Sequence, residues 1–101
     1  MPKVFISQPM KGKTTAQIVA ERESVVNQLE SLGYTVMDSV IKTPPADVAS
    51  ERVWCLGESL KMLSTCDCIF FMKGWEGATG CRIEEMVART YGIPCMTDID
   101  K

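Results

Sequence analysis

The sequence predicts an α/β fold, a small three-layer sandwich in which a four-stranded parallel sheet carries helices on both faces. Short apolar, β-rich runs alternate along the chain with longer runs whose apolar residues recur at helical spacing. Strands separated by helices of this length pair in parallel through right-handed crossovers. With 101 residues, of which 46% are hydrophobic and 24% charged, the chain is expected to form one globular domain over residues 1–101.

The elements follow one another without a linker. In order, they are a strand at 3–8, a helix that starts at 12–14, a strand at 34–38, a helix at 50–65, a strand at 67–72, a helix at 79–91 and a strand at 93–98. After Lys3, the first strand has no polar residue until Ser7, as expected of a strand covered on both faces, and Pro9 ends it. Thr14 and Gln17 have capping-box spacing at the start of the first helix, and Gly33 is its expected left-handed stop.

Helices and strands also alternate in the second half of the chain. The apolar residues that predict its first helix are Val53, Leu56, Leu60 and Leu63. Gly57 is a weak point in that helix. A continuous apolar run at 68–72 predicts a buried strand, and a glycine-rich turn leads from it into a helix whose clear pattern begins at Ile83 and stops at Gly92. The resulting strand order is 2-1-3-4, a Rossmann- or flavodoxin-like arrangement.

Composition excludes several classes of function. The net charge is −2 and no block of Lys or Arg stands out, so duplex nucleic acid is not expected as a partner. The longest apolar runs are about five residues, too short for a membrane span, and a cytoplasmic location is expected. The five cysteines form no C-x-x-C pair and are expected to be reduced, and without any histidine no metal site is expected. The lack of histidine also excludes Ser-His-Asp and Cys-His catalysis, leaving carboxylates, Tyr, Lys or water for acid–base chemistry.

The strand order places a ligand before any motif is considered. Open parallel sheets bind ligands at the carboxyl ends of their strands where connections diverge, here between the first and third strands. The groups expected there are Ser7, Gln8, Pro9 and Met10 after the first strand, and Gly74, Trp75 and the turn at Gly80 after the third. Trp75 would be a lid that stacks on a base or an interface anchor.

Glu84 is the candidate nucleophile or general base. It is expected in the first turn of the third helix, after a glycine-rich turn that offers free N–H groups and the positive end of a helix dipole. A carboxylate there that faces a cavity can act as nucleophile or base. The alternative is that Glu84 and Glu85 only complement the helix dipole.

Six segments together resemble a known superfamily. They are Phe-Ile-Ser-Gln-Pro-Met-Lys-Gly-Lys-Thr at 5–14, Leu-Gly-Glu-Ser-Leu at 56–60, Asp-Cys-Ile-Phe-Phe at 67–71, Gly-Trp at 74–75, Gly-Cys-Arg-Ile-Glu at 80–84 and Gly-Ile-Pro at 92–94. Their residues and order are similar to those of the nucleoside 2-deoxyribosyltransferase-like superfamily, and more closely to its short, uncharacterised, largely bacterial and phage branch. The resemblance spans nearly the whole chain and implies a domain that handles a nucleoside or nucleotide without a cofactor.

The resemblance also implies roles for individual residues. In active enzymes of the superfamily, the glutamate of a Gly-x-x-x-Glu pattern attacks or stabilises the anomeric carbon of an N-glycoside, and Gly80 with Glu84 matches that pattern. Glu84 would form a glycosyl-enzyme that water or a second base resolves. The switch point and the resemblance together give the candidate substrate-binding residues Ser7, Gln8, Pro9, Met10, Ser59, Trp75, Ala78, Gly80 and Arg82.

Three positions depart from the superfamily pattern. Its second carboxylate is replaced by Ser59, with Glu58 one residue earlier, and a Ser or Asp that holds the sugar or its phosphate is replaced by Ala78. A small residue is replaced by Arg82, whose guanidinium could take over a phosphate or simply fill space. Two functions therefore remain: an enzyme of N-glycosidic bonds with a glutamate nucleophile, or a catalytically inactive nucleotide-binding module that senses or sequesters its ligand.

Five further residues have expected places. Lys11 and Lys13 are candidates for phosphate contacts. Trp54 is expected in a dimer interface or in the core, because the resemblance implies a homo-oligomer whose neighbouring subunits help close each site. Asp67 is expected to be structural, opening its strand, and Tyr91 is expected in the core.

Overall fold

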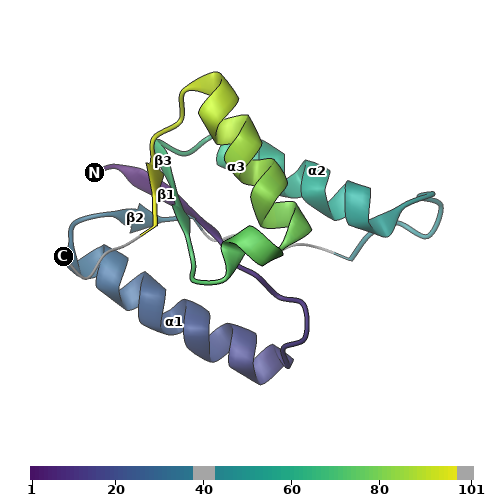
Figure 1. Ribbon diagram of the computed structural model, residues 1–101, viewed down its shortest axis with the longest axis horizontal. Helices are drawn as coiled ribbons and strands as arrows, with labels where there is room; N and C mark the ends of the chain where they lie inside the picture. Colours follow the sequence, from purple (N-terminus) through teal and green to yellow (C-terminus); the bar gives the residue numbers. More distant parts are fainter. Residues whose placement is uncertain (38–42, 98–101) are drawn as a thin grey trace.

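The sheet lies between one helix on one face and two helices on the other (Figure 1). The computed structural model describes residues 1–37 and 43–97. Its elements are β1 Lys3–Ser7, α1 Thr15–Ser31, β2 Thr35–Val36, α2 Glu51–Leu63, β3 Cys68–Phe71, the 3-10 turn η1 Trp75–Gly77, α3 Thr79–Tyr91 and β4 Cys95–Met96. The strands pair in parallel in the order β2-β1-β3-β4. The predicted fold class and strand order are confirmed.

The two central strands separate two apolar cores. β1 and β3 pair in register from Val4 with Cys68 to Ser7 with Phe71. Because side chains alternate between the faces of a strand, successive residues of each strand enter different cores. On the α1 face the buried residues are Val4, Ile6, Leu29, Cys68, Phe70 and Met72. On the α2 and α3 face they are Phe5, Leu63, Ile69, Phe71 and Ala88. Burial on both faces explains why β1 and β3 are continuous apolar runs.

The helix boundaries follow local signals in the sequence. Thr14 caps α1, with both capping-box hydrogen bonds to Gln17 present, and Ser50 caps α2 by accepting from the backbone of Val53. Gly33 and Gly92 follow α1 and α3 with φ of +95° and +74°, the left-handed region that favours glycine. The predicted capping box at Thr14 and the two predicted glycine stops are confirmed, whereas α2 is shorter than the predicted helix at 50–65. Among the described residues, no helix is long and apolar enough to cross a membrane.

The edge strands and the third helix depart from the predicted boundaries. β2 and β4 have two residues each, and the predicted strand ends at Asp38 and Asp98 lie outside the described residues. α3 begins at Thr79, so Glu84 lies in its second turn, and the prediction of the first turn is wrong. The prediction that Tyr91 lies in the core is also wrong: it is 77% exposed, because α3 runs past Ala88, its last buried residue.

Candidate active site

A buried hydrogen bond joins the end of the first strand to the third helix. Ser7 is the last residue of β1, and Glu84 lies on the inward face of α3 with Cys81 and Ala88. The Ser7 hydroxyl Oγ donates to Glu84 Oε1 at 2.6 Å. The side chains are almost fully enclosed, with exposed fractions of 1% for Ser7 and 7% for Glu84. The structure therefore brings together two residues that sequence analysis assigned to one site.

Burial and hydrogen bonding have opposite effects on the Glu84 carboxyl. Burial is the larger effect, and it raises the pKa of Glu84 above its ordinary value because a charged group loses solvation there. The hydrogen bond from Ser7 lowers the same pKa, since it stabilises the ionised form. When ionised, a carboxylate in this position is poorly solvated and more basic than one in water. These are the properties expected of a nucleophile or general base.

Cys81 is a third polar group at this place, and sequence analysis missed it. Its side chain is buried and lies one helical turn before Glu84 on the same face of α3. Burial is the largest effect on the pKa of the Cys81 thiol and raises it, and the Glu84 charge raises it further. The signal that could have identified Cys81 is its spacing of three residues from Glu84.

The residues after Ser7 diverge. Gln8 turns toward α1, where its Nε2 donates to the carbonyl oxygen of Ile18 at 2.8 Å. Gln8 Oε1 is buried without a hydrogen-bond partner among the described residues. Pro9 is buried beside the loop after β3: a Cβ placed on Gly74 would lie 3.7 Å from Pro9 Cγ. The structure thus brings the loops after β1 and β3 together, as the switch point predicts, but Gln8 lies on the opposite face from Glu84.

Trp75 is anchored at the carboxyl end of the third strand. Its ring packs on Phe71 with ring centroids 4.8 Å apart and planes inclined by 37°. Phe71 pairs with Ser7 in the sheet register, so both aromatic rings lie on the Glu84 side of the sheet. Trp75 is half-buried and is available to contact a ligand at this edge. Phe71 therefore lies next to Ser7 on this side of the sheet, whereas sequence analysis placed it only within the buried strand at 68–72.

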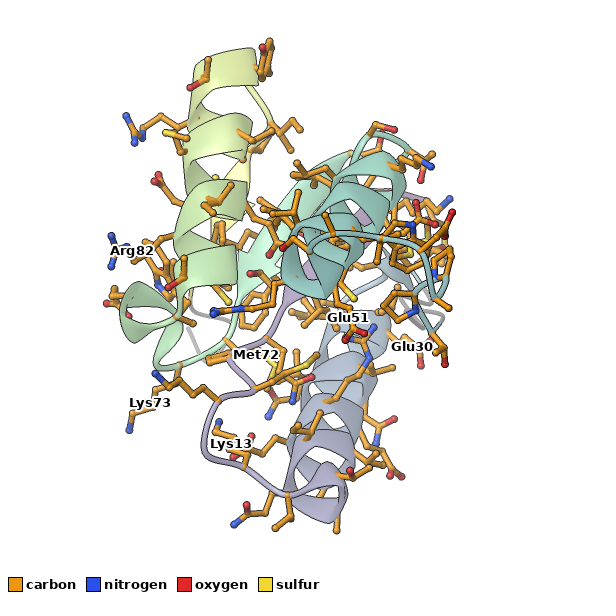
Figure 2. All side chains as sticks on the ribbon, turned by 90° about the vertical axis from the view of Figure 1, so that its right-hand side faces the viewer. Lys13, Glu30, Glu51, Met72, Lys73 and Arg82 are labelled. Atoms are coloured by element: carbon orange, nitrogen blue, oxygen red, sulfur yellow. The ribbon has the colours of Figure 1, made fainter. Side chains whose placement is uncertain are left out.

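The start of α3 holds three further candidates, of which one faces away from Glu84. Ala78 is the N-cap residue and offers no capping side chain, and Gly80 lies inside the first turn. Arg82 is exposed and is separated from Glu84 by about 200° of helix rotation. It borders a shallow hollow of about 440 Å³ outside α3, together with Trp75 and Glu85. Figure 2 shows the Arg82 side chain pointing outward, away from the fold. The structure does not bring Arg82 and Glu84 together.

The remaining predicted residues lie at mixed depths. Met10 is 52% exposed in the loop after β1, and Ser59 is buried on α2. Lys13 pairs with Glu21 at 2.8 Å, whereas Lys11 and Lys73 are exposed. Figure 2 shows Lys13 and Lys73 on the loops that follow β1 and β3. These loops would supply the cations for an anionic ligand.

Two acidic residues near the candidate positions have other contacts. Glu58, one residue before Ser59, pairs with Lys61 on the outside of α2 at 2.8 Å. Asp67 Oδ2 accepts from the backbone nitrogen of Lys3 at 2.7 Å, at the opposite end of the sheet from Glu84, which is the structural place expected for it. Within residues 1–37 and 43–97, no three His, Cys, Asp or Glu side chains form a group that could hold a metal ion.

Comparison with known proteins identifies a family and a shared fold. The family described as "Domain of unknown function (DUF4406)" matches residues 2–97. A solved structure of a 2-deoxyribosyltransferase from the psychrotolerant bacterium Bacillus psychrosaccharolyticus matches with a TM-score of 0.67. This likeness covers 94% of the present chain and 70% of the other at 19% sequence identity, and shows the fold. A sequence comparison with curated proteins gives no match.

Proposed function

The chain belongs to the DUF4406 family, and we propose that it cleaves or transfers the N-glycosidic bond of a nucleoside or nucleoside 5′-monophosphate, with Glu84 as nucleophile. One observation carries the proposal: a buried carboxylate, hydrogen-bonded by Ser7 at 2.6 Å, lies where open parallel sheets bind ligands. The fold shared with a 2-deoxyribosyltransferase supports the same reaction class.

The proposed reaction has two steps. In the first, Glu84 Oε2 forms a bond to C1′ of the sugar while the C1′–N bond breaks, and the base leaves with the bonding electrons and takes a proton from water. In the second, water or another base attacks C1′, loses a proton to solvent and releases the carboxylate. The positive charge that develops on the sugar is stabilised by Glu84, and a poorly solvated carboxylate does this more strongly than one in water.

The chemistry of the leaving base determines which substrates are expected to be cleaved fastest. Ser59 stands where the resemblance places a second carboxylate, and a serine is a weak proton donor at neutral pH. A base that already carries a positive charge leaves as a neutral molecule and needs no proton. We therefore expect a 7-methylguanine nucleoside to release its base faster than the matching guanine nucleoside.

The assay for this prediction uses the purified protein. A panel of ribonucleosides, 2′-deoxynucleosides and their 5′-monophosphates is incubated with and without a second free base, and released or exchanged base is quantified by chromatography. Glu84→Gln is the matched control, since it removes the nucleophile and keeps the shape of the side chain. If the wild-type protein releases 7-methylguanine from its nucleoside no faster than Glu84→Gln does, the enzyme proposal is wrong.

The second candidate function is a nucleotide-binding module without catalysis. Ser59 and Ala78, which replace polar groups of the superfamily pattern, favour it. Calorimetry with the same panel distinguishes the two functions: tight binding without base release over hours supports the module. The exposed Lys11 and Lys73 would then hold a phosphate, because Arg82 faces away from Glu84.

We also propose a homo-oligomer, at least a dimer, in which α2 forms the contact. Figure 1 shows α2 and the loop before it reaching beyond the sheet. Val53 on this helix is 67% exposed, and Trp54 beside it is half-buried. Light scattering at micromolar concentration is expected to give at least twice the 11.2 kDa mass of the chain, and Val53→Asp is expected to reduce it. A mass of one chain for the wild-type protein would contradict this prediction.

A further inference from the structure

The Ser7 hydroxyl has a single proton, and that proton is donated to Glu84. The distance of 2.6 Å between Ser7 Oγ and Glu84 Oε1 is within the range of hydrogen bonds from a hydroxyl to an ionised carboxylate. Ser7 therefore cannot donate the same proton to a substrate. A buried hydroxyl whose proton is donated in this way influences the substrate through the carboxylate that it holds.

We propose that Ser7 is the positioning residue of Glu84: it fixes Oε1 and leaves Oε2 as the atom that attacks. This role rests on the proposed function of Glu84 as nucleophile, and it replaces the expectation that Ser7 binds substrate directly. The hydrogen bond to Oε1 also selects one rotamer of the carboxylate. Less conformational entropy is therefore lost when Glu84 reaches the geometry for attack.

The sheet holds Ser7 itself in place. Its side chain is 1% exposed, it pairs in register with Phe71, and its carbonyl oxygen accepts from the backbone nitrogen of Met72 at 3.0 Å. A donor on a central strand has little freedom to follow the carboxylate if α3 moves. The geometry is thus set by the packing of α3 against β1 and β3, as expected of a preorganised site.

The groups that face Glu84 are few, which makes the effect of Ser7 measurable. Within the described part of the chain, Ser7 on β1 is the polar group that acts on the pKa of Glu84, and burial is the other cause. Cys81 on α3 is a neighbouring titratable group, and burial raises the pKa of its thiol. Glu58 on α2 pairs with Lys61, and Glu85 on α3 pairs with Arg89, both on outer faces.

The test compares Ser7→Ala with Ser7→Thr, which keeps the hydroxyl. In wild-type protein kcat/KM is expected to rise with pH as Glu84 ionises. In Ser7→Ala the rise is expected at higher pH, because the hydrogen bond that lowers the pKa of Glu84 is gone. The kcat of Ser7→Ala is expected to fall on the order of tenfold to a hundredfold, the range for a lost hydrogen bond to a charged group. KM is expected to change little, and Ser7→Thr should restore the wild-type pH profile.

A second measurement does not depend on activity. Carbon-13 NMR of the glutamate carboxyl groups, assigned with Glu84→Gln, gives the pKa of Glu84 directly in each folded variant. A higher pKa in Ser7→Ala than in wild type, reversed in Ser7→Thr, supports the positioning role even if the protein releases no base. An unchanged or lower pKa in Ser7→Ala would overturn it, as would a rise in KM with unchanged kcat, which indicates direct substrate binding.

Discussion

Replacing Glu84 by glutamine is expected to abolish base release while the fold is retained. The amide keeps the shape of the side chain but cannot form the glycosyl-enzyme bond. The expected loss in kcat is at least about a thousandfold, since removing the nucleophile of a covalent mechanism can cost on the order of 10⁶-fold. Initial rates of base release, with circular dichroism to verify the fold, check this prediction.

The same variant is expected to change the pH dependence of stability. The pKa of Glu84 is raised in the folded protein, so its contribution to the free energy of unfolding is fully present below the unfolded pKa near 4.5 and is lost as pH rises through the folded value. A glutamine does not titrate and lacks this loss. Above the folded pKa of Glu84, the variant is therefore expected to be at least as stable as the wild type in denaturant unfolding.

Glu85→Gln is the matched control on the same helix. Glu85 pairs with Arg89 at 3.1 Å on the outer face of α3 and is rotated by about 100° from Glu84. Its substitution is expected to leave base release within about twofold of wild type, because a surface ion pair contributes little to the fold and does not face the site. Equal losses of base release in Glu84→Gln and Glu85→Gln would show that both carboxylates act only by complementing the helix dipole and that Glu84 is not a nucleophile.

The fold could be predicted from sequence because its strongest signals are local. The continuous apolar runs of β1 and β3 and the capping box at Thr14 depend on residues close in the chain, and the structure confirms them. The first and last residues of the edge strands could not be predicted as accurately. In the described part of the chain, β2 and β4 each hydrogen-bond to a single neighbouring strand, so where pairing stops depends on tertiary contacts and not on the composition of the run.

The sequence could predict which chain segments meet at the candidate site, but it could not predict the contacts between their side chains. The switch point correctly brings the ends of β1 and β3 together beside Glu84. Ser7 hydrogen-bonds to α3 and Gln8 to α1 because successive side chains point to opposite faces at the end of β1. A shift of one residue in the strand would exchange the faces of these two side chains. Helix geometry alone could have separated Arg82 from Glu84, because residues two apart lie on nearly opposite faces.

Replacing Phe71 by alanine is expected to cause a large loss of stability and to alter the Glu84 site at the same time. Phe71 is 1% exposed on a central strand and packs on Trp75 with centroids 4.8 Å apart. Its truncation is expected to lower the free energy of unfolding by about 3–5 kcal/mol, from lost burial and the cavity left behind. For a domain of this size, that corresponds to a fall in Tm of more than about 12 °C, measurable by thermal unfolding.

Phe70→Ala separates the effect on stability from the effect on the site. Phe70 is the next residue of β3, is 5% exposed and packs in the other core, against α1. A similar loss of stability is expected there, but Phe71→Ala alone removes the ring beside Ser7 and admits water to Glu84. The rise of kcat/KM with pH is therefore expected to move to lower pH in Phe71→Ala, toward the ordinary glutamate range, because burial is the main cause of the raised pKa. If both alanine variants moved the profile equally, the change would reflect loosening of the whole sheet, and Phe71 would have no separate part in desolvating Glu84.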